Sequence, residues 1–171
     1  MKKLFAVALA VLSFCGLTQV AYAFGETATV QNGSTVPPGW VITQVLPGSG
    51  LWIIENLNGG PFGAGAEVIN GSPVPTGWVI TQVLPGSARW ELENLNGGHF
   101  GAGAEVINGS PLPDGWVITQ VLPGSTRWEL EDLNGATSGA KAEVINGSPV
   151  PAGWVVTQVL PGSNRWILTK L

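Results

Sequence analysis

The sequence has little of the chemistry on which most enzymes depend. Among 171 residues it contains one cysteine, Cys15, and one histidine, His99, and only 11% of its residues are charged. A single cysteine excludes an internal disulfide, and with one histidine a zinc site would need carboxylates almost alone. We therefore predict no metal site and no cofactor.

The sparse charge is also unevenly divided, with 11 acidic residues against 7 basic ones. An acidic chain is repelled by a phosphate backbone, so no nucleic-acid partner is expected. Glu91 and Glu93 could form a carboxylate pair of the kind that hydrolyses glycosides, but the first and last repeats lack it. His99 lies alone in a glycine-rich segment. We predict no catalytic residue and a protein that is not an enzyme.

What the N-terminus does contain is the pattern of a secretory signal. Lys2 and Lys3 precede an apolar run from Leu4 to Leu17, and Ala21-Tyr22-Ala23 follows. This arrangement predicts a signal peptide over residues 1–23 and a mature chain over 24–171. Cys15 would be removed with it, leaving five basic and 11 acidic residues and a formal charge of −6. We expect a secreted protein, periplasmic or extracellular, of bacterial type.

The mature chain consists of a 38-residue unit repeated four times. The string GWVITQVLPGS begins at Gly39, Gly77 and Gly115, and recurs at Gly153 with Val156 in place of isoleucine. Such self-similarity defines a repeat architecture. The predicted units are 24–61, 62–99, 100–137 and 138–171.

The sequence of each unit predicts three short strands. In the second unit Trp78–Leu84 is rich in β-branched and aromatic residues, and Pro85-Gly86-Ser87 is expected to form a turn. Polar and apolar residues then alternate over Arg89–Leu95. These segments form a hairpin, and Ala66–Ile69 supplies a third strand. We predict an all-β fold of about twelve short antiparallel strands.

The hairpin register decides which side chains share a face. Pairing Leu84 with Trp90 through a bulge or a longer loop separates the apolar residues from the charged ones, so this register is favoured. It places Gln82 on the apolar face, where its amide would need a hydrogen-bond partner. We therefore expect Gln82 to tie one unit to the next.

The terminal units are more apolar than the inner ones. Leu51 stands where the second unit has Arg89, and Ile53 and Ile167 stand where it has a glutamate. Polar caps are typical of open solenoids. The apolar ends therefore favour closure into a propeller- or barrel-like ring. The alternative is an open β-repeat array that assembles end to end, as a homo-oligomer through Leu51, Ile53 and Ile167.

The eight tryptophans fall into two sets in register with the repeat. The first set follows the proline-containing loop: Trp40, Trp78, Trp116 and Trp154. The second set lies inside the following strand: Trp52, Trp90, Trp128 and Trp166. Large aromatics commonly fill cores, but loops on a rigid scaffold often carry binding residues. We predict that the first set forms four weak ligand-binding sites and that the second set fills the core.

Two functions follow for a chain of this composition. The first is a non-catalytic, lectin-like module that binds a glycan or cell-surface polysaccharide through the first tryptophan set, with four sites acting together. The alternative is a structural protein of the cell surface or extracellular matrix that self-assembles through its apolar terminal units.

Overall fold

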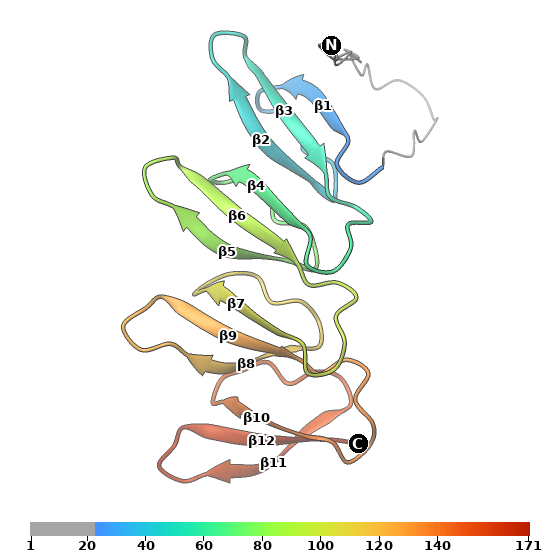
Figure 1. Ribbon diagram of the computed structural model, residues 1–171, viewed down its shortest axis with the longest axis vertical. Coiled ribbons are helices and arrows are strands. Elements are labelled where there is room, and N and C mark those ends of the chain that lie inside the picture. Colours follow the sequence, from blue (N-terminus) through green and yellow to red (C-terminus); the bar gives the residue numbers. More distant parts are fainter. Residues whose placement is uncertain (1–22) are drawn as a thin grey trace, which may run out of the picture. The chain divides into compact units, whose positions relative to one another are not determined.

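The computed structural model describes residues 23–171, and the described chain contains strands and turns without a helix. The predicted signal peptide lies almost wholly outside the described residues. Twelve strands are present, three in each repeat, which confirms the all-β prediction (Figure 1). They are β1 (Thr27–Gln31), β2 (Trp40–Leu46), β3 (Leu51–Asn56), β4 (Gly65–Ile69), β5 (Trp78–Leu84), β6 (Arg89–Asn94), β7 (Gly103–Ile107), β8 (Trp116–Val121), β9 (Arg127–Asp132), β10 (Lys141–Ile145), β11 (Trp154–Leu160) and β12 (Arg165–Lys170).

Each repeat forms its own three-stranded antiparallel sheet. The last strand of the repeat lies in the centre, so the orders are β1-β3-β2, β4-β6-β5, β7-β9-β8 and β10-β12-β11. By its contacts the chain divides into two compact units. The first contains the described residues up to Gly60 together with Val68–Pro75, and the second contains Pro61–Glu67 and Thr76–Leu171.

Ring or barrel closure is not supported. Among residues 23–171 the four sheets are separate, and no outer strand of one sheet is hydrogen-bonded into another. Within the second compact unit, β5 lies beside β7 and β8 lies beside β10 (Figure 1). Adjacent repeats of this unit therefore meet through the packing of their outer strands, without a continuous hydrogen-bonded ladder.

The predicted bulge is present, but the predicted pairing of Leu84 with Trp90 is wrong. Leu84 pairs with Arg89, Val83 pairs with Trp90, and the register shifts between Ile80 and Gln82. The extra residue lies in the middle of β5, which leaves the turn at its four-residue length. The same shift occurs in β2, β8 and β11. Apolar and charged side chains are still separated, with Val83 in the place expected for Leu84.

The Gly-Trp pair that opens the second strand of each repeat has a local cause. Gly77 has a φ of 84°, a left-handed conformation that favours glycine. A Cβ atom there would lie 2.0 Å from the side chain of Asn96. The Asn96 amide in turn donates a hydrogen bond of 3.1 Å to the carbonyl of Thr76. The glycine thus allows this asparagine to close the loop against the strand.

Candidate functional site

The first tryptophan set, predicted to bind ligand, lies in the hydrophobic core. Their exposed fractions are small: Trp40 6%, Trp78 2%, Trp116 1% and Trp154 5%. Trp116 packs in a cluster with Val106, Ile118 and Leu130. Burial of this extent leaves almost no indole face for a sugar. It favours the structural role that the sequence left open for these residues.

The second tryptophan set, predicted to be core, is more exposed. Trp90 is half-buried, and its cross-strand partner Val83 is 47% exposed. The other half-buried members are Trp52, Trp128 and Trp166, and their partners Val45, Val121 and Val159 are all exposed. The register explains the pairing, because the four-residue turn sets Leu84 opposite Arg89 and therefore Val83 opposite Trp90. Each hairpin therefore carries one apolar pair in contact with solvent.

The contact between successive repeats is the most regular feature of the second compact unit. Val117 and Leu133 of the third repeat pack with Val144, Trp154 and Leu168 of the fourth. One repeat earlier, the equivalent residues Val79 and Leu95 pack with the core of the third repeat. All four junction residues of the earlier repeats are at most 2% exposed. We call this contact the junction.

A serine hydroxyl supplies the polar bond of the junction. The backbone N–H of Ile80 donates to Ser110 Oγ at 2.8 Å, and Ile118 donates to Ser148 Oγ at the same distance. Within the first compact unit, Ile42 makes the equivalent bond to Ser72, also at 2.8 Å. Gln82, predicted to make such a tie, is exposed. The serine was missed because its segment reads as an ordinary turn.

Two further contacts cross the junctions of the second compact unit. The Phe62 ring stacks on Trp116, with ring centroids 6.5 Å apart and an interplanar angle of 20°. The Arg165 guanidinium donates to the carbonyl of Thr119 at 2.7 Å. Both residues reach from one repeat to its neighbour. They add aromatic and charge-assisted contacts to the apolar junction.

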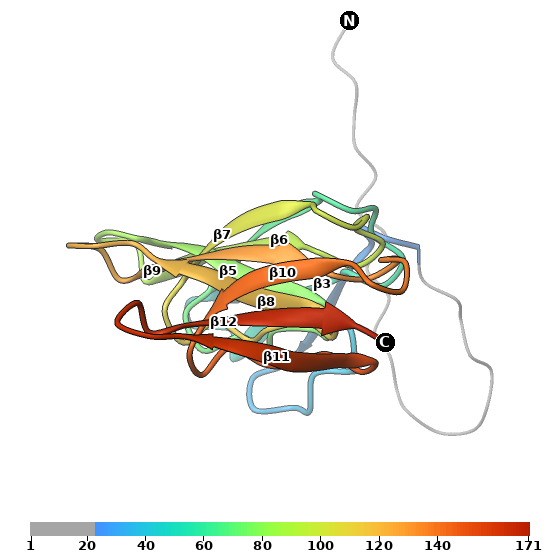
Figure 2. The ribbon, with the colours of Figure 1, turned by 90° about the horizontal axis from the view of Figure 1, so that it is seen from below.

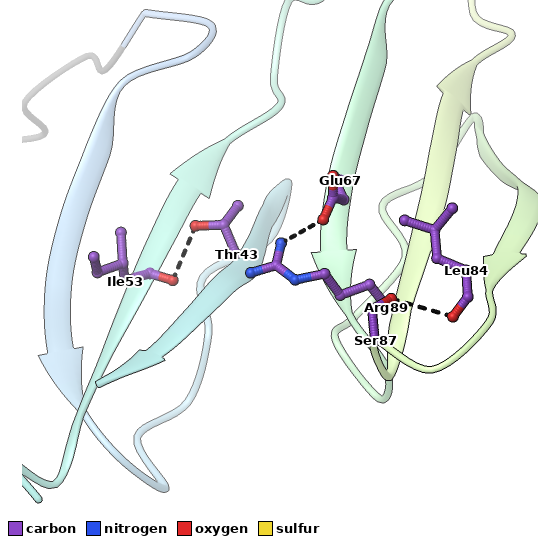
Figure 3. A network of polar contacts seen from close by, with 6 residues as sticks. All are labelled: Thr43, Ile53, Glu67, Leu84, Ser87 and Arg89. Atoms are coloured by element: carbon purple, nitrogen blue, oxygen red, sulfur yellow. Dashed lines mark hydrogen bonds and ion pairs between the residues drawn. The ribbon is translucent and has the colours of Figure 1, made fainter. Parts of the chain in front are cut away.

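The arginine that opens the third strand of a repeat also pairs within its own sheet. Arg89 contacts Glu67 on the neighbouring strand at 2.8 Å (Figure 3). Arg127 with Glu105 and Arg165 with Glu143 repeat this ion pair. Thr43, at the bulge of β2, donates to the Ile53 carbonyl at 3.3 Å (Figure 3). These contacts connect neighbouring strands of each sheet.

In the last repeat, the outer strand and the final leucine are more exposed to solvent than their equivalents in the third repeat. Val156 is 41% exposed and Leu171 71% exposed, whereas the equivalent Ile118 and Leu133 are 5% and 2% exposed. In Figure 1 the strand β11 lies at the lower edge of the second compact unit, and in Figure 2, seen from below, none of the other strands of that unit lies over it. The half of the junction that β8 buries is therefore open to solvent on β11.

The first repeat shows the complementary half. Val30 of β1 is half-buried, although its equivalents Val68, Val106 and Val144 are fully buried. Ser34 is exposed, whereas Ser72, Ser110 and Ser148 are 4–5% exposed. Each of these residues belongs to the side of a repeat that meets the preceding one. Repeats one and four thus expose opposite halves of the same junction.

The titratable residues that the sequence singled out, His99, Glu91 and Glu93, lie at or near the surface of the described chain. His99 is exposed, and no group of three metal-ligating side chains comes together in residues 23–171. Glu67, Glu91 and Glu93 line one shallow depression. Burial raises the pKa of the Glu55 carboxyl above its ordinary value, but this glutamate lies on β3 without a catalytic partner among the described residues.

Two other searches bear on function. Among the described residues no helix is long and apolar enough to span a membrane. Comparison with family models, with curated proteins and with solved structures found no match to the chain. The proposal of a function therefore rests on the geometry of the repeats.

Proposed function

We propose that this chain is an exported, non-catalytic structural protein that associates end to end. One observation carries the proposal. The last repeat exposes one half of the junction and the first repeat exposes the other half, at positions whose equivalents in the internal repeats are buried. Open outer strands with apolar side chains are templates for association with another chain. A second copy would bury Val155, Val156 and Leu171, as the fourth repeat buries Val117, Ile118 and Leu133.

The substitutions in the last repeat support this proposal. Ile167 and Thr169 stand where the third repeat has Glu129 and Glu131, so β12 carries two fewer carboxylates on that side. A sheet face exposed only to water gains nothing from the loss of charge, because charged side chains are mostly found on exposed surface. The loss of charge is the change that burial against another chain would favour.

The proposal is tested by light scattering on the purified protein over a wide range of concentration. We expect the mass to rise with concentration, and Val156→Lys to keep the protein monomeric. Val121→Lys is the matched control, because Val121 is also exposed but lies near a hairpin turn, away from the uncovered junction. A wild-type mass that stays monomeric at every concentration would contradict the proposal.

A second candidate function, glycan binding, is favoured by the half-buried tryptophans paired with exposed valines. Gln82, Asn108 and Thr126 line a second shallow depression together with Val83, the cross-strand partner of Trp90. These side chains offer hydrogen-bonding groups next to an apolar pair. Affinity electrophoresis in polysaccharide gels tests it. Trp90→Ala should weaken retention if this function holds, and retention equal to wild type would remove the candidate.

A further inference from the structure

We infer that the second copy docks through its first repeat, in the register of an internal repeat, and that two substitutions weaken this junction so that it is reversible. The inference rests on the proposed end-to-end association and specifies its partner surface. The alternative geometry is isologous, in which two last repeats or two first repeats meet each other. An isologous contact stops at a dimer, whereas a head-to-tail contact continues.

The apolar part of the junction favours the head-to-tail geometry. Internally, Val117 and Leu133 pack against the side of the next repeat that carries Val144 and Trp154. The equivalents are Val155 and Leu171 on the last repeat, and Val30 and Trp40 on the first, where Val30 is half-buried and Trp40 is 6% exposed. Each end therefore offers one half of an interface that already exists in the chain. Two copies of the same half have no such precedent in the structure.

The serine bond favours the same register. The donors of this bond are Ile42, Ile80 and Ile118, and Val156 is their equivalent in β11. The acceptors are Ser72, Ser110 and Ser148, and the first repeat retains the equivalent serine, Ser34. Ser34 is exposed, so its hydroxyl is accessible to a second copy. The geometry points to a Val156 N–H bond to Ser34 Oγ between two chains.

Two internal contacts cannot form in this junction. Ser138 takes the place of Phe62, whose ring stacks on Trp116, so the ring that would lie on Trp40 is absent. Leu51 takes the place of Arg165, so the bond to the carbonyl of residue 119 has no counterpart at Thr157. The intermolecular junction is therefore weaker than an internal one. These substitutions keep the ends associating reversibly while the internal junctions stay closed.

A mixing experiment tests the register. Val156→Lys blocks the last repeat and Ser34→Arg blocks the first, and sedimentation velocity gives the mass of each variant alone and of the mixture. We expect each variant alone to be monomeric and the equimolar mixture to form a dimer, because one open end of each kind remains. Dimerisation by either variant alone would overturn the head-to-tail register while leaving self-association established. A wild-type protein that never associates would instead defeat the proposed function.

A gain of affinity tests the weakening. Ser138→Phe restores the ring that stacks on the next tryptophan, and we expect it to tighten association by about 2- to 10-fold. Thr137→Phe is the control, since it adds the same side chain at the neighbouring exposed position. Equal effects of the two variants would mean that the gain is non-specific and would overturn the assignment of Ser138. Far-ultraviolet circular dichroism establishes that each variant is folded.

Discussion

The outer strands β8 and β11 have nearly the same sequence and very different surroundings. β8 begins Trp-Val-Ile-Thr-Gln-Val and β11 begins Trp-Val-Val-Thr-Gln-Val. Val117 and Ile118 are buried, but Val155 is half-buried and Val156 is exposed. Burial at these positions is therefore a property of the neighbouring repeat and not of the strand. A repeat unit is complete only when another surface covers it.

The largest expected difference between the two strands lies at the leucine that ends each repeat. Leu133→Ala should lower the free energy of unfolding by about 2–5 kcal/mol, because it opens a cavity in the junction. Leu171→Ala should change it by less than about 0.5 kcal/mol, since Leu171 is 71% exposed. Urea denaturation of the dilute monomer measures both. Equal losses would show that the terminal leucine is as well packed as the internal one.

This contrast also shows what the sequence could and could not predict. Strands, turns and repeat phase follow from local residue types, so Trp78–Leu84 was placed at the observed bounds of β5. The register failed because a bulge in the middle of a strand and a longer turn separate apolar from charged residues equally well. In the observed register Thr81 is the extra residue, and its hydroxyl donates to the Glu91 carbonyl at 3.3 Å.

The roles of the tryptophans could not be predicted for a related reason. Trp78 follows a loop, which suggested a binding residue, but its indole is only 2% exposed, and the equivalent Trp116 packs with Val79 and Leu95 of the preceding repeat. Trp90 lies within a strand, which suggested core, but it is the second residue of β6, next to the exposed hairpin turn. The burial of the first set therefore depends on residues of another repeat, and the exposure of the second set depends on the hairpin register. A single sequence gives no direct signal of such contacts.

A smaller effect is expected at the serine of the junction. Ser110→Ala leaves the buried N–H of Ile80 without its acceptor, and we expect a loss of about 1–3 kcal/mol in stability. Ser34→Ala should have an effect below about 0.5 kcal/mol in the monomer, because Ser34 is exposed. Thermal unfolding of the two variants at low protein concentration checks the pair. A large loss at Ser34 would mean that this serine already has a partner within the chain.

The smallest effect compares the last residues of β6 and β9. The Asn94 side chain is buried and donates to the carbonyl of Pro61 at 3.1 Å, whereas the equivalent Asp132 has no N–H to offer. Asp132 Oδ2 is buried without a hydrogen-bond partner among the described residues. For Asp132, the carbonyl equivalent to that of Pro61 is the carbonyl of His99. The aspartate therefore loses a bond that the asparagine makes.

Asp132→Asn should restore this bond and stabilise the protein by about 1 kcal/mol, measured by urea denaturation. The backbone N–H of Asn134, which donates to Asp132 Oδ1 at 2.8 Å, keeps its acceptor in the variant, as the equivalent Asn96 N–H does with Asn94. Asn94→Asp is the reciprocal control and should destabilise the second repeat. A loss of stability on Asp132→Asn would instead show that the carboxylate makes a stabilising interaction in the third repeat that an amide cannot replace.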